Sequence, residues 1–91
     1  MTLDYANMTS RQNVTTYTAN KKCRIYFYVY GTTSFFSNLI NNISIVQQNT
    51  SLTGGMPRAY FTCDLNAGDV FSTVVHSGSI EASSIVVIPY K

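Results

Sequence analysis

The sequence predicts an all-β protein, and the fold class we expect is a small antiparallel β-sandwich or jelly roll of seven to eight short strands. Three observations lead to this prediction. Runs of β-branched and aromatic residues recur along the 91-residue chain, turn residues separate the runs at even spacing, and no stretch has helical periodicity. Such spacing is typical of sandwiches and jelly rolls.

The first residues are expected to lie outside the sandwich. Residues 1–13 are polar and lack periodicity, so they are predicted to form an N-terminal arm or docking segment. The β-sandwich domain is then expected to span residues 14–91. Its first strand is predicted at residues 14–18, which are β-branched and aromatic, and residues 19–22 form the following turn.

Residues 23–30 make the strongest predicted strand. Alternate residues share a face, which gives one face with Cys23, Ile25, Phe27 and Val29, and another with Arg24, Tyr26, Tyr28 and Tyr30. A strand with one face in bulk water would show a more polar alternation. We therefore expect the tyrosine side to be covered as well, by another subunit or inside the sandwich.

The middle of the chain predicts loops and a hairpin. A loop at residues 31–34 precedes a hairpin at residues 39–46, in which Asn41 and Asn42 form the turn because asparagine tolerates a positive φ. Residues 47–55 are predicted to be a loop. Pro57 then opens a strand at residues 58–63, and proline suits a first or edge position.

The last third begins with a turn at residues 66–69. There, Gly68 supplies a positive φ and the Asp69 carboxylate accepts backbone N–H groups. A strand at residues 70–75, a loop at residues 76–82 and a final strand at residues 83–89 complete the prediction.

Charge and composition favour neutral contacts. Six basic and four acidic residues give a net charge of +2, too small and too scattered for nucleic-acid binding. Seven tyrosines among many neutral polar residues suit contacts with protein or sugar. No apolar run approaches the roughly 20 residues that a membrane span needs, so we expect no membrane insertion. No secretory signal precedes the domain, which indicates synthesis in a cytoplasm.

The small size of the chain predicts oligomerisation. A domain of 91 residues buries a thin core, which disulfides, metals or further subunits usually supplement. A single histidine and two cysteines argue against a metal, and we expect no cofactor. Cys23 and Cys63 are interpreted as two buried free thiols, because a cytoplasmic origin disfavours a disulfide, although spacing alone does not decide whether they pair.

The stripe of Arg24, Tyr26, Tyr28 and Tyr30 has two interpretations. It could be an aromatic platform for sugar rings, or a sheet face packed in a subunit interface or inside the sandwich. Tyrosine suits interfaces, because its ring buries apolar area while its hydroxyl finds a partner. We favour the structural interpretation and take these four residues as the candidate interface of a homotrimer.

Receptor contact is expected from the loops, because loops on a rigid scaffold usually carry recognition. Ordinary connections remain the alternative. The candidate receptor contacts are Thr32, Thr33, Ser34, Asn49, Thr50, Ser51, His76 and Ser77.

The sequence does not indicate an enzyme. Asp64, Asp69 and Glu81 show no pairing pattern of the kind that a glycosidase needs, and Asp69 is explained by its turn. His76 is not accompanied by a nucleophile elbow. We therefore expect no catalytic residues.

Five segments resemble a group of small phage virion domains found at the carboxyl ends of tail-fibre and head-fibre proteins. Residues 4–8 (Asp-Tyr-Ala-Asn-Met) are similar to their lead-in, residues 17–19 (Tyr-Thr-Ala) to their first turn element, and residues 40–43 (Ile-Asn-Asn-Ile) to their hairpin. Residues 65–70 (Leu-Asn-Ala-Gly-Asp-Val) resemble their Ala-Gly-Asp turn, and residues 88–91 (Ile-Pro-Tyr-Lys) match their ending. The chain departs from the pattern at Asn20, Lys22 and Asn42, where the family usually has proline or glycine.

The resemblance implies a jelly roll of tumour-necrosis-factor-like shape that forms a homotrimer at the end of a fibre and contacts the host surface. On this basis the expected function is that of a phage virion protein, a fibre tip or a head or tail decoration, which attaches to the host by passive multivalent binding. Its expected partners are itself, a larger virion component bound through residues 1–13, and a host glycan or protein. The alternative is a bacterial non-catalytic carbohydrate-binding module, which would be monomeric with its tyrosine stripe exposed.

Overall fold

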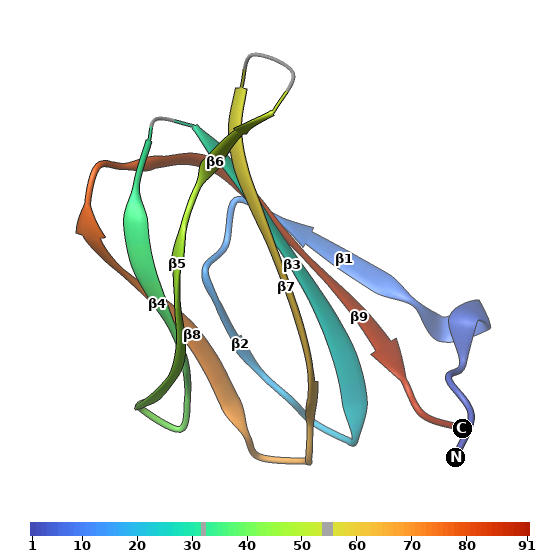
Figure 1. The fold of residues 1–91 in the computed structure, drawn as a ribbon. Coiled ribbons are helices and arrows are strands. Elements are labelled where there is room, and N and C mark those ends of the chain that lie inside the picture. The colour runs from blue at the N-terminus through green and yellow to red at the C-terminus, as the bar shows by residue number, and fades with distance from the viewer. Residues whose placement is uncertain (32, 54–55) are drawn as a thin grey trace.

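Two antiparallel sheets pack face to face (Figure 1), which confirms the predicted β-sandwich. The structure is a computed structural model that describes residues 1–31, 33–53 and 56–91, with the side chains of residues 51–53 and 56 outside that description. One sheet has the strand order β1-β9-β3-β7-β6 and the other β2-β8-β4-β5. The strands alternate between the sheets from β1 to β4 and from β7 to β9, whereas β4 and β5, and β6 and β7, pair within one sheet; crossovers of this kind are those of a jelly roll.

Nine strands are described, against the seven to eight expected. They are β1 (Thr9–Gln12), β2 (Thr16–Thr18), β3 (Cys23–Gly31), β4 (Phe35–Ile40), β5 (Ile43–Asn49), β6 (Ser51–Thr53), β7 (Met56–Leu65), β8 (Val70–Ser77) and β9 (Ile80–Pro89). A short 3-10 helix, η1 (Tyr5–Asn7), precedes β1. The additional strands, β1 and β6, are short and lie at the two edges of the five-stranded sheet.

The prediction that residues 1–13 lie outside the sandwich is wrong for most of the segment. Residues of β1 pair with β9, from Thr9 opposite Val87 to Gln12 opposite Ser84. Before β1, the amide of Asp4 donates to the carbonyl of Pro89 at 2.7 Å. The segment showed no alternation because every residue of this edge strand is exposed, so no position demanded an apolar side chain.

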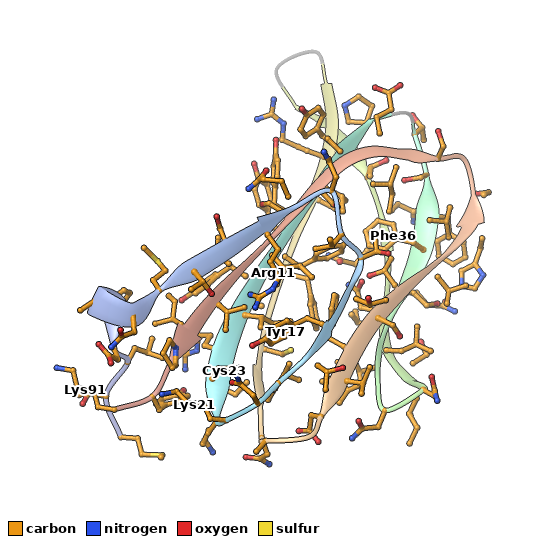
Figure 2. The ribbon with its side chains drawn as sticks, turned by 180° about the vertical axis from the view of Figure 1, so that it is seen from behind. Arg11, Tyr17, Lys21, Cys23, Phe36 and Lys91 are labelled. Carbon is orange, nitrogen blue, oxygen red and sulfur yellow. The ribbon has the colours of Figure 1, made fainter. Side chains whose placement is uncertain are left out.

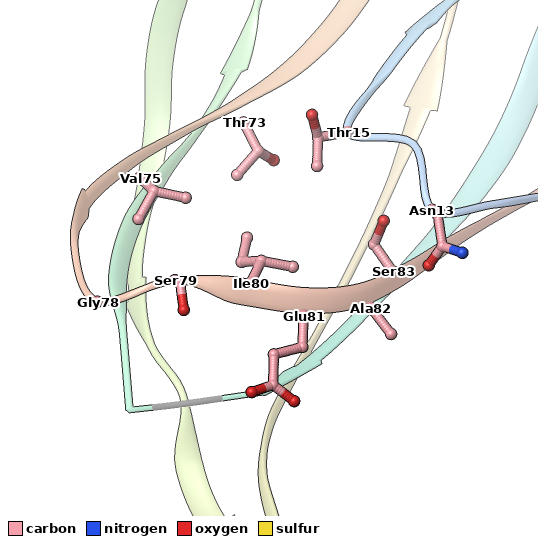
Figure 3. A pocket seen from close by; sticks show the side chains of 10 residues that line it. All are labelled: Asn13, Thr15, Thr73, Val75, Gly78, Ser79, Ile80, Glu81, Ala82 and Ser83. Carbon is pink, nitrogen blue, oxygen red and sulfur yellow. The ribbon is translucent and has the colours of Figure 1, made fainter.

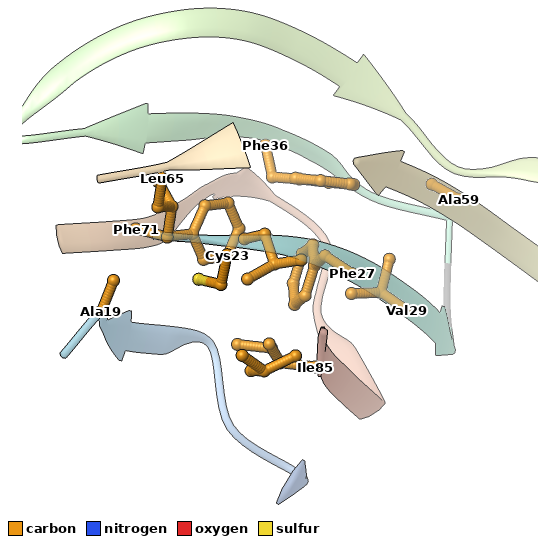
Figure 4. Close-up of a cluster of buried hydrophobic side chains, with 11 residues drawn as sticks. Ala19, Cys23, Phe27, Val29, Phe36, Ala59, Leu65, Phe71 and Ile85 are labelled. Atoms are coloured by element: carbon orange, nitrogen blue, oxygen red, sulfur yellow. The ribbon is translucent and has the colours of Figure 1, made fainter. Parts of the chain in front are cut away.

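The core lies between the sheets and confirms the alternation predicted for β3 (Figure 4). Its inward residues, from Cys23 to Val29, are at most 2% exposed. Phe27 meets Phe71 of the other sheet edge to face, with ring centroids 5.0 Å apart, and Phe61 stacks on Phe71 at 5.9 Å. These contacts join the two sheets through aromatic rings, which bury large areas per side chain.

Both predicted turns are confirmed. Asn41 and Asn42 have φ angles of 53° and 66°, and Gly68 has 90°. The Asp69 carboxylate accepts the amide N–H of Asn66 at 2.8 Å. The Asn41 side chain links the two turns, because its Nδ2 donates to Asp69 at 3.0 Å and its Oδ1 accepts the amide of Val70 at 2.9 Å.

Two predicted loops are shorter than expected. In place of a loop at residues 47–55, β5 continues to Asn49 and β6 follows at Ser51–Thr53. In place of a loop at residues 76–82, β8 ends at Ser77 and β9 begins at Ile80. Gln47, Asn49, His76 and Ser77 are exposed at these strand ends, where pairing needs backbone groups and not apolar side chains. Pro57 lies near the start of β7, as predicted, although β7 is an interior strand.

The chain ends lie together at one end of the sandwich, at the lower right of Figure 1. The amide of Lys91 donates to the carbonyl of Thr2 at 2.8 Å, and Leu3 forms a bridge with Tyr90. The opposite end of β3 leads into the segment at residues 31–34. The sandwich therefore has a terminal end and a loop end.

Candidate binding surfaces

The outer surface of the five-stranded sheet carries a cluster of four tyrosines, Tyr26, Tyr28, Tyr30 and Tyr60, which we call the tyrosine face. Strand register places Tyr28 opposite Tyr60, and their ring centroids lie 5.0 Å apart. The rings of Tyr28 and Tyr30 lie 5.7 Å apart. Tyr26 is 41% and Tyr60 is 63% exposed, so the cluster is open to solvent in a single chain.

A shallow apolar depression lies within the tyrosine face. It has a volume of about 200 Å³. The residues that line it belong to β3 and β7 and are Tyr26, Phe27, Tyr28, Tyr60, Phe61 and Thr62. Aromatic rings around a small concave surface suit either a sugar ring or an apolar side chain of another subunit. The depression is thus compatible with both interpretations of the stripe.

Arg24, the fourth residue of the predicted interface, is neutralised within the chain. Its Nε donates to Oδ1 of Asp64 at 2.8 Å, and its Nη2 donates to the Tyr90 hydroxyl at 3.1 Å. Tyr90 in turn donates to Asp64. The hydrogen bond from Arg24 is the main reason that the pKa of Asp64 is lowered, and the bond to Asp64 raises the pKa of Tyr90. The terminal end of the tyrosine face therefore carries a closed network with little net charge.

The structure places all four predicted interface residues on one outward surface, and their role in a trimer stays a prediction. The sequence analysis missed the contribution of β7. Its outward residues Arg58, Tyr60, Thr62 and Asp64 lie opposite those of β3 and complete the surface. The same alternation in residues 58–64 was the available signal, but pairing partners are not visible in a sequence.

The second sheet also exposes apolar side chains, which the sequence analysis did not single out. Strands β5 and β8 leave aliphatic residues in solvent, namely Ile43, Ile45, Val46, Val70, Val74 and Val75. The tyrosine face differs from this surface in its aromatic side chains and its depression.

The predicted receptor segments meet at the loop end, but two of their residues are buried. Ser34 and Thr50 are 2% and 7% exposed. They join their segments, because the amide of Ser34 donates to the Thr50 hydroxyl at 2.9 Å and the amide of Thr50 donates to the carbonyl of Ser34 at 3.0 Å. As candidate receptor contacts these two residues are wrong, because both side chains are buried and out of reach of a receptor. Thr33 and Asn49 lie exposed beside them.

The remaining predicted contacts differ in position. His76 and Ser77 are exposed, but they belong to β8 and not to a loop. The Nε2 atom of His76 lies 2.6 Å from the Ser37 hydroxyl, and its ring lies 5.3 Å from that of Phe35. Thr32 and the side chain of Ser51 lie outside the described residues. The exposed candidates that remain are therefore Thr33, Asn49, His76 and Ser77.

A cleft of about 390 Å³ opens between β8, the start of β9 and the corner between β1 and β2 (Figure 3). Thr15, Thr73, Ser79 and Ser83 contribute hydroxyls to its lining, and Glu81 contributes a carboxylate. Some of these hydroxyls serve the fold, since Ser83 donates to the carbonyl of Val14 at 2.7 Å and Thr73 donates to Oδ1 of Asn38 at 2.9 Å. The cleft thus combines hydroxyls and one carboxylate with the apolar side chains of Val75, Ile80 and Ala82.

Both cysteines are free thiols in the structure, with Cys23 buried and Cys63 half-buried. Burial raises the pKa of each thiol, that of Cys63 to about 11. Neither is therefore a thiolate at neutral pH.

The acids considered for catalysis have separate positions. Asp64 belongs to the network with Arg24, Asp69 holds the turn before β8, and Glu81 lines the cleft between β8 and β9. Among the described residues, no three His, Cys, Asp or Glu side chains are grouped to hold a metal ion. No helix in that part of the chain is long and apolar enough to cross a membrane.

Comparison with known proteins adds no relative: no family model matches the sequence, and no curated protein matches it significantly.

Proposed function

We propose that the chain is a structural protein of a phage virion, which forms a homotrimer and attaches the particle to the host surface by passive multivalent binding. The observation that carries this proposal is the tyrosine face. Its aromatic side chains lie exposed around an apolar depression, with Tyr60 63% exposed, and surfaces of this kind on small domains mark interaction sites. The resemblance of five segments to fibre domains, and the jelly-roll strand order, support the same function.

The chemistry of the tyrosine face fits contact with further copies of the chain. Tyrosine rings bury apolar area in an interface while their hydroxyls keep hydrogen bonds. Arg24 is already paired with Asp64, so an interface that covers Arg24 does not leave its guanidinium without an acidic partner. The thin core of a domain of 91 residues also gains from additional buried area.

The two ends of the sandwich suit two different attachments. At the terminal end, Met1, Tyr5 and Met8 are exposed apolar side chains, and they would join the trimer to a larger virion component. At the loop end, Thr33 and Asn49 would face the host surface (Figure 1). Because three chains per trimer and many trimers per particle act together, weak single contacts would add up to strong attachment.

Labelling of intact particles tests this function. Antibodies against the purified chain should label virions from cells that produce it, and the purified chain added beforehand should reduce adsorption of those virions to their host. Chain found only in the lysate and never on particles would contradict the proposal. A heat-denatured sample is the control for adsorption.

The alternative function is that of a carbohydrate-binding module. It is favoured by the depression among Tyr26, Tyr28 and Tyr60, whose volume of about 200 Å³ suits contact with one sugar ring. Tyr28→Ala separates the two functions, because Tyr28 touches both Tyr30 and Tyr60. Dissociation of a trimer by this variant supports the subunit interface. An unchanged oligomer that loses glycan binding on an array supports the module.

A further inference from the structure

A second cleft opens between β1 and β2, which are edge strands of opposite sheets (Figure 2). Its volume is about 260 Å³. Cys23 and Val87, both almost fully buried, form its apolar base together with Pro89. The polar side chains around it are Asn7, Thr9, Arg11, Tyr17, Asn20 and Lys21.

The cleft carries positive charge that the described part of the chain does not neutralise. Arg11 and Lys21 both line it, and within residues 1–31, 33–53 and 56–91 no ion pair joins either of them to an acid. One lining residue, Asn7, is hydrogen-bonded to an acid: its Nδ2 donates to Oδ2 of Asp4 at 2.7 Å. Two cations therefore line a small space, and the carboxylate bonded to its lining already has a partner in Asn7.

The guanidinium of Arg11 is held in place and not free to sample all directions. Its central carbon lies 4.6 Å from the centroid of the Tyr17 ring, a cation–π contact, and its Nη1 donates to the Thr9 hydroxyl at 3.3 Å. Figure 2 shows Arg11, Tyr17, Cys23 and Lys21 following one another along the space between β1 and β2. Burial raises the pKa of Tyr17, so its phenol keeps the proton as a hydrogen-bond donor.

From this arrangement we infer that the cleft binds the carboxylate of a single acidic sugar. Arg11, held against Tyr17, recognises the carboxylate by charge-assisted hydrogen bonds, and Lys21 adds a second positive charge to the lining. The side chains of Asn7, Asn20 and Thr9 offer donors and acceptors to sugar hydroxyls, as in other polar ligand sites. A volume of about 260 Å³ lies below the range of about 300–1,000 Å³ that is usual for drug-sized ligands, which fits one sugar ring and not an oligosaccharide.

The inference rests on the proposed function, because host attachment is what gives a surface sugar as the ligand. It adds the class of that sugar, and it adds the edge cleft between β1 and β2 to the loop end as a host contact. Multivalent attachment tolerates a weak individual site of this kind, since each trimer would present three copies.

The chain offers a matched control variant for this cleft. Lys22 follows Lys21 directly, but its Nζ lies 5.8 Å from the centroid of the Tyr90 ring, and Lys22 does not line the cleft. Lys21→Gln and Lys22→Gln remove the same charge from adjacent positions. A difference between them therefore reports contact in the cleft and not the overall field of the protein.

Titration of the ¹⁵N-labelled chain with sodium D-glucuronate, followed by NMR, tests the inference. We expect shifts of the amide signals of Arg11, Tyr17 and Lys21, and none with D-glucose. Lys21→Gln and Arg11→Gln should each weaken glucuronate binding about fivefold, the effect expected for partly exposed charge pairs. Lys22→Gln should change it by less than about twofold, and well-dispersed spectra confirm that each variant is folded.

Three results would overturn the inference. They are the absence of glucuronate shifts at the cleft, an equal loss in Lys21→Gln and Lys22→Gln, and inorganic phosphate binding at the same residues as tightly as glucuronate, which would indicate a general anion site. Light scattering on the same samples separates this outcome from failure of the proposed function. A trimer without glucuronate shifts contradicts the cleft alone, whereas a monomer with shifts contradicts the trimer alone.

Discussion

Replacing Tyr60 by alanine should dissociate the proposed trimer while leaving the single chain folded. Tyr60 is 63% exposed in the single chain, so little of its ring supports the fold. Its main described neighbour is Tyr28, with ring centroids 5.0 Å apart. The loss of that pair should cost the isolated chain about 1 kcal/mol.

The effect on association follows from the exposed area. A tyrosine side chain offers roughly 200 Å² for burial, and the 63% that is exposed leaves about 125 Å² per subunit for an interface. At about 25 cal/mol per Å², full burial contributes up to about 3 kcal/mol per subunit, and about 9 kcal/mol per trimer. Because three chains associate, the concentration for half-dissociation varies as the inverse square root of the association constant. It should therefore rise by up to about a thousandfold.

Sedimentation equilibrium over a dilution series measures this shift, and thermal unfolding followed by circular dichroism measures the fold. Tyr5→Ala is the matched control, because Tyr5 is 61% exposed but lies on η1, away from the tyrosine face. We expect it to leave the dissociation midpoint unchanged. The reasoning is refuted if Tyr60→Ala and Tyr5→Ala dissociate at the same concentration as the unchanged chain.

Three further predictions concern the fold. Gly78→Ala should lower the free energy of unfolding by more than about 3 kcal/mol, because Gly78 has φ +74° and an added Cβ would overlap the carbonyl of Thr33. Gly68→Ala should lower it by about 1–2 kcal/mol only, because Gly68 has φ +90° but open space around the added Cβ, and urea unfolding compares the two variants. Asn42→Ala should lower the free energy of unfolding by about 1 kcal/mol, because alanine is strained at the φ of 66° that Asn42 adopts. Asn42→Gly should not lower it, because glycine accepts this φ, and equal unfolding midpoints for the two variants would contradict the reasoning. Asp64→Asn should lower stability at pH 7 by less than about 1 kcal/mol, because the ion pair is more than one-third exposed. The folded pKa of Asp64 is lowered, so its contribution is present above the unfolded value of about 3.9 and disappears as pH falls through the folded value; a difference that persists unchanged at pH 2 would contradict this origin.

The elements predicted correctly are those whose signal is local. The alternation in β3 follows from burial of one face, so Phe27 and its neighbours could be assigned to a common face from the sequence alone, and the structure shows that this face is the inner one. The turns at Asn42 and Gly68 follow from the residues that accept a positive φ. In each case the physical cause acts within a few residues of the chain.

The elements that were missed depend on contacts between distant segments. The exposed strand β1 forms because β9 offers it a hydrogen-bonding edge, and none of its residues needs to be apolar. The burial of Ser34 and Thr50 arises from their mutual bonds across 16 residues. The cleft between β1 and β2 likewise exists only once Arg11 and Lys21 are brought together by the fold. No pattern in the sequence encodes these three features.

The mass of the chain in solution tests the central claim most directly. The account predicts a particle of about three times the 10.1 kDa chain by light scattering at micromolar concentration. Such a particle would be the trimer that covers the tyrosine face. A mass of 10.1 kDa that persists to millimolar concentration would contradict it and leave Tyr26, Tyr28, Tyr30 and Tyr60 open to solvent.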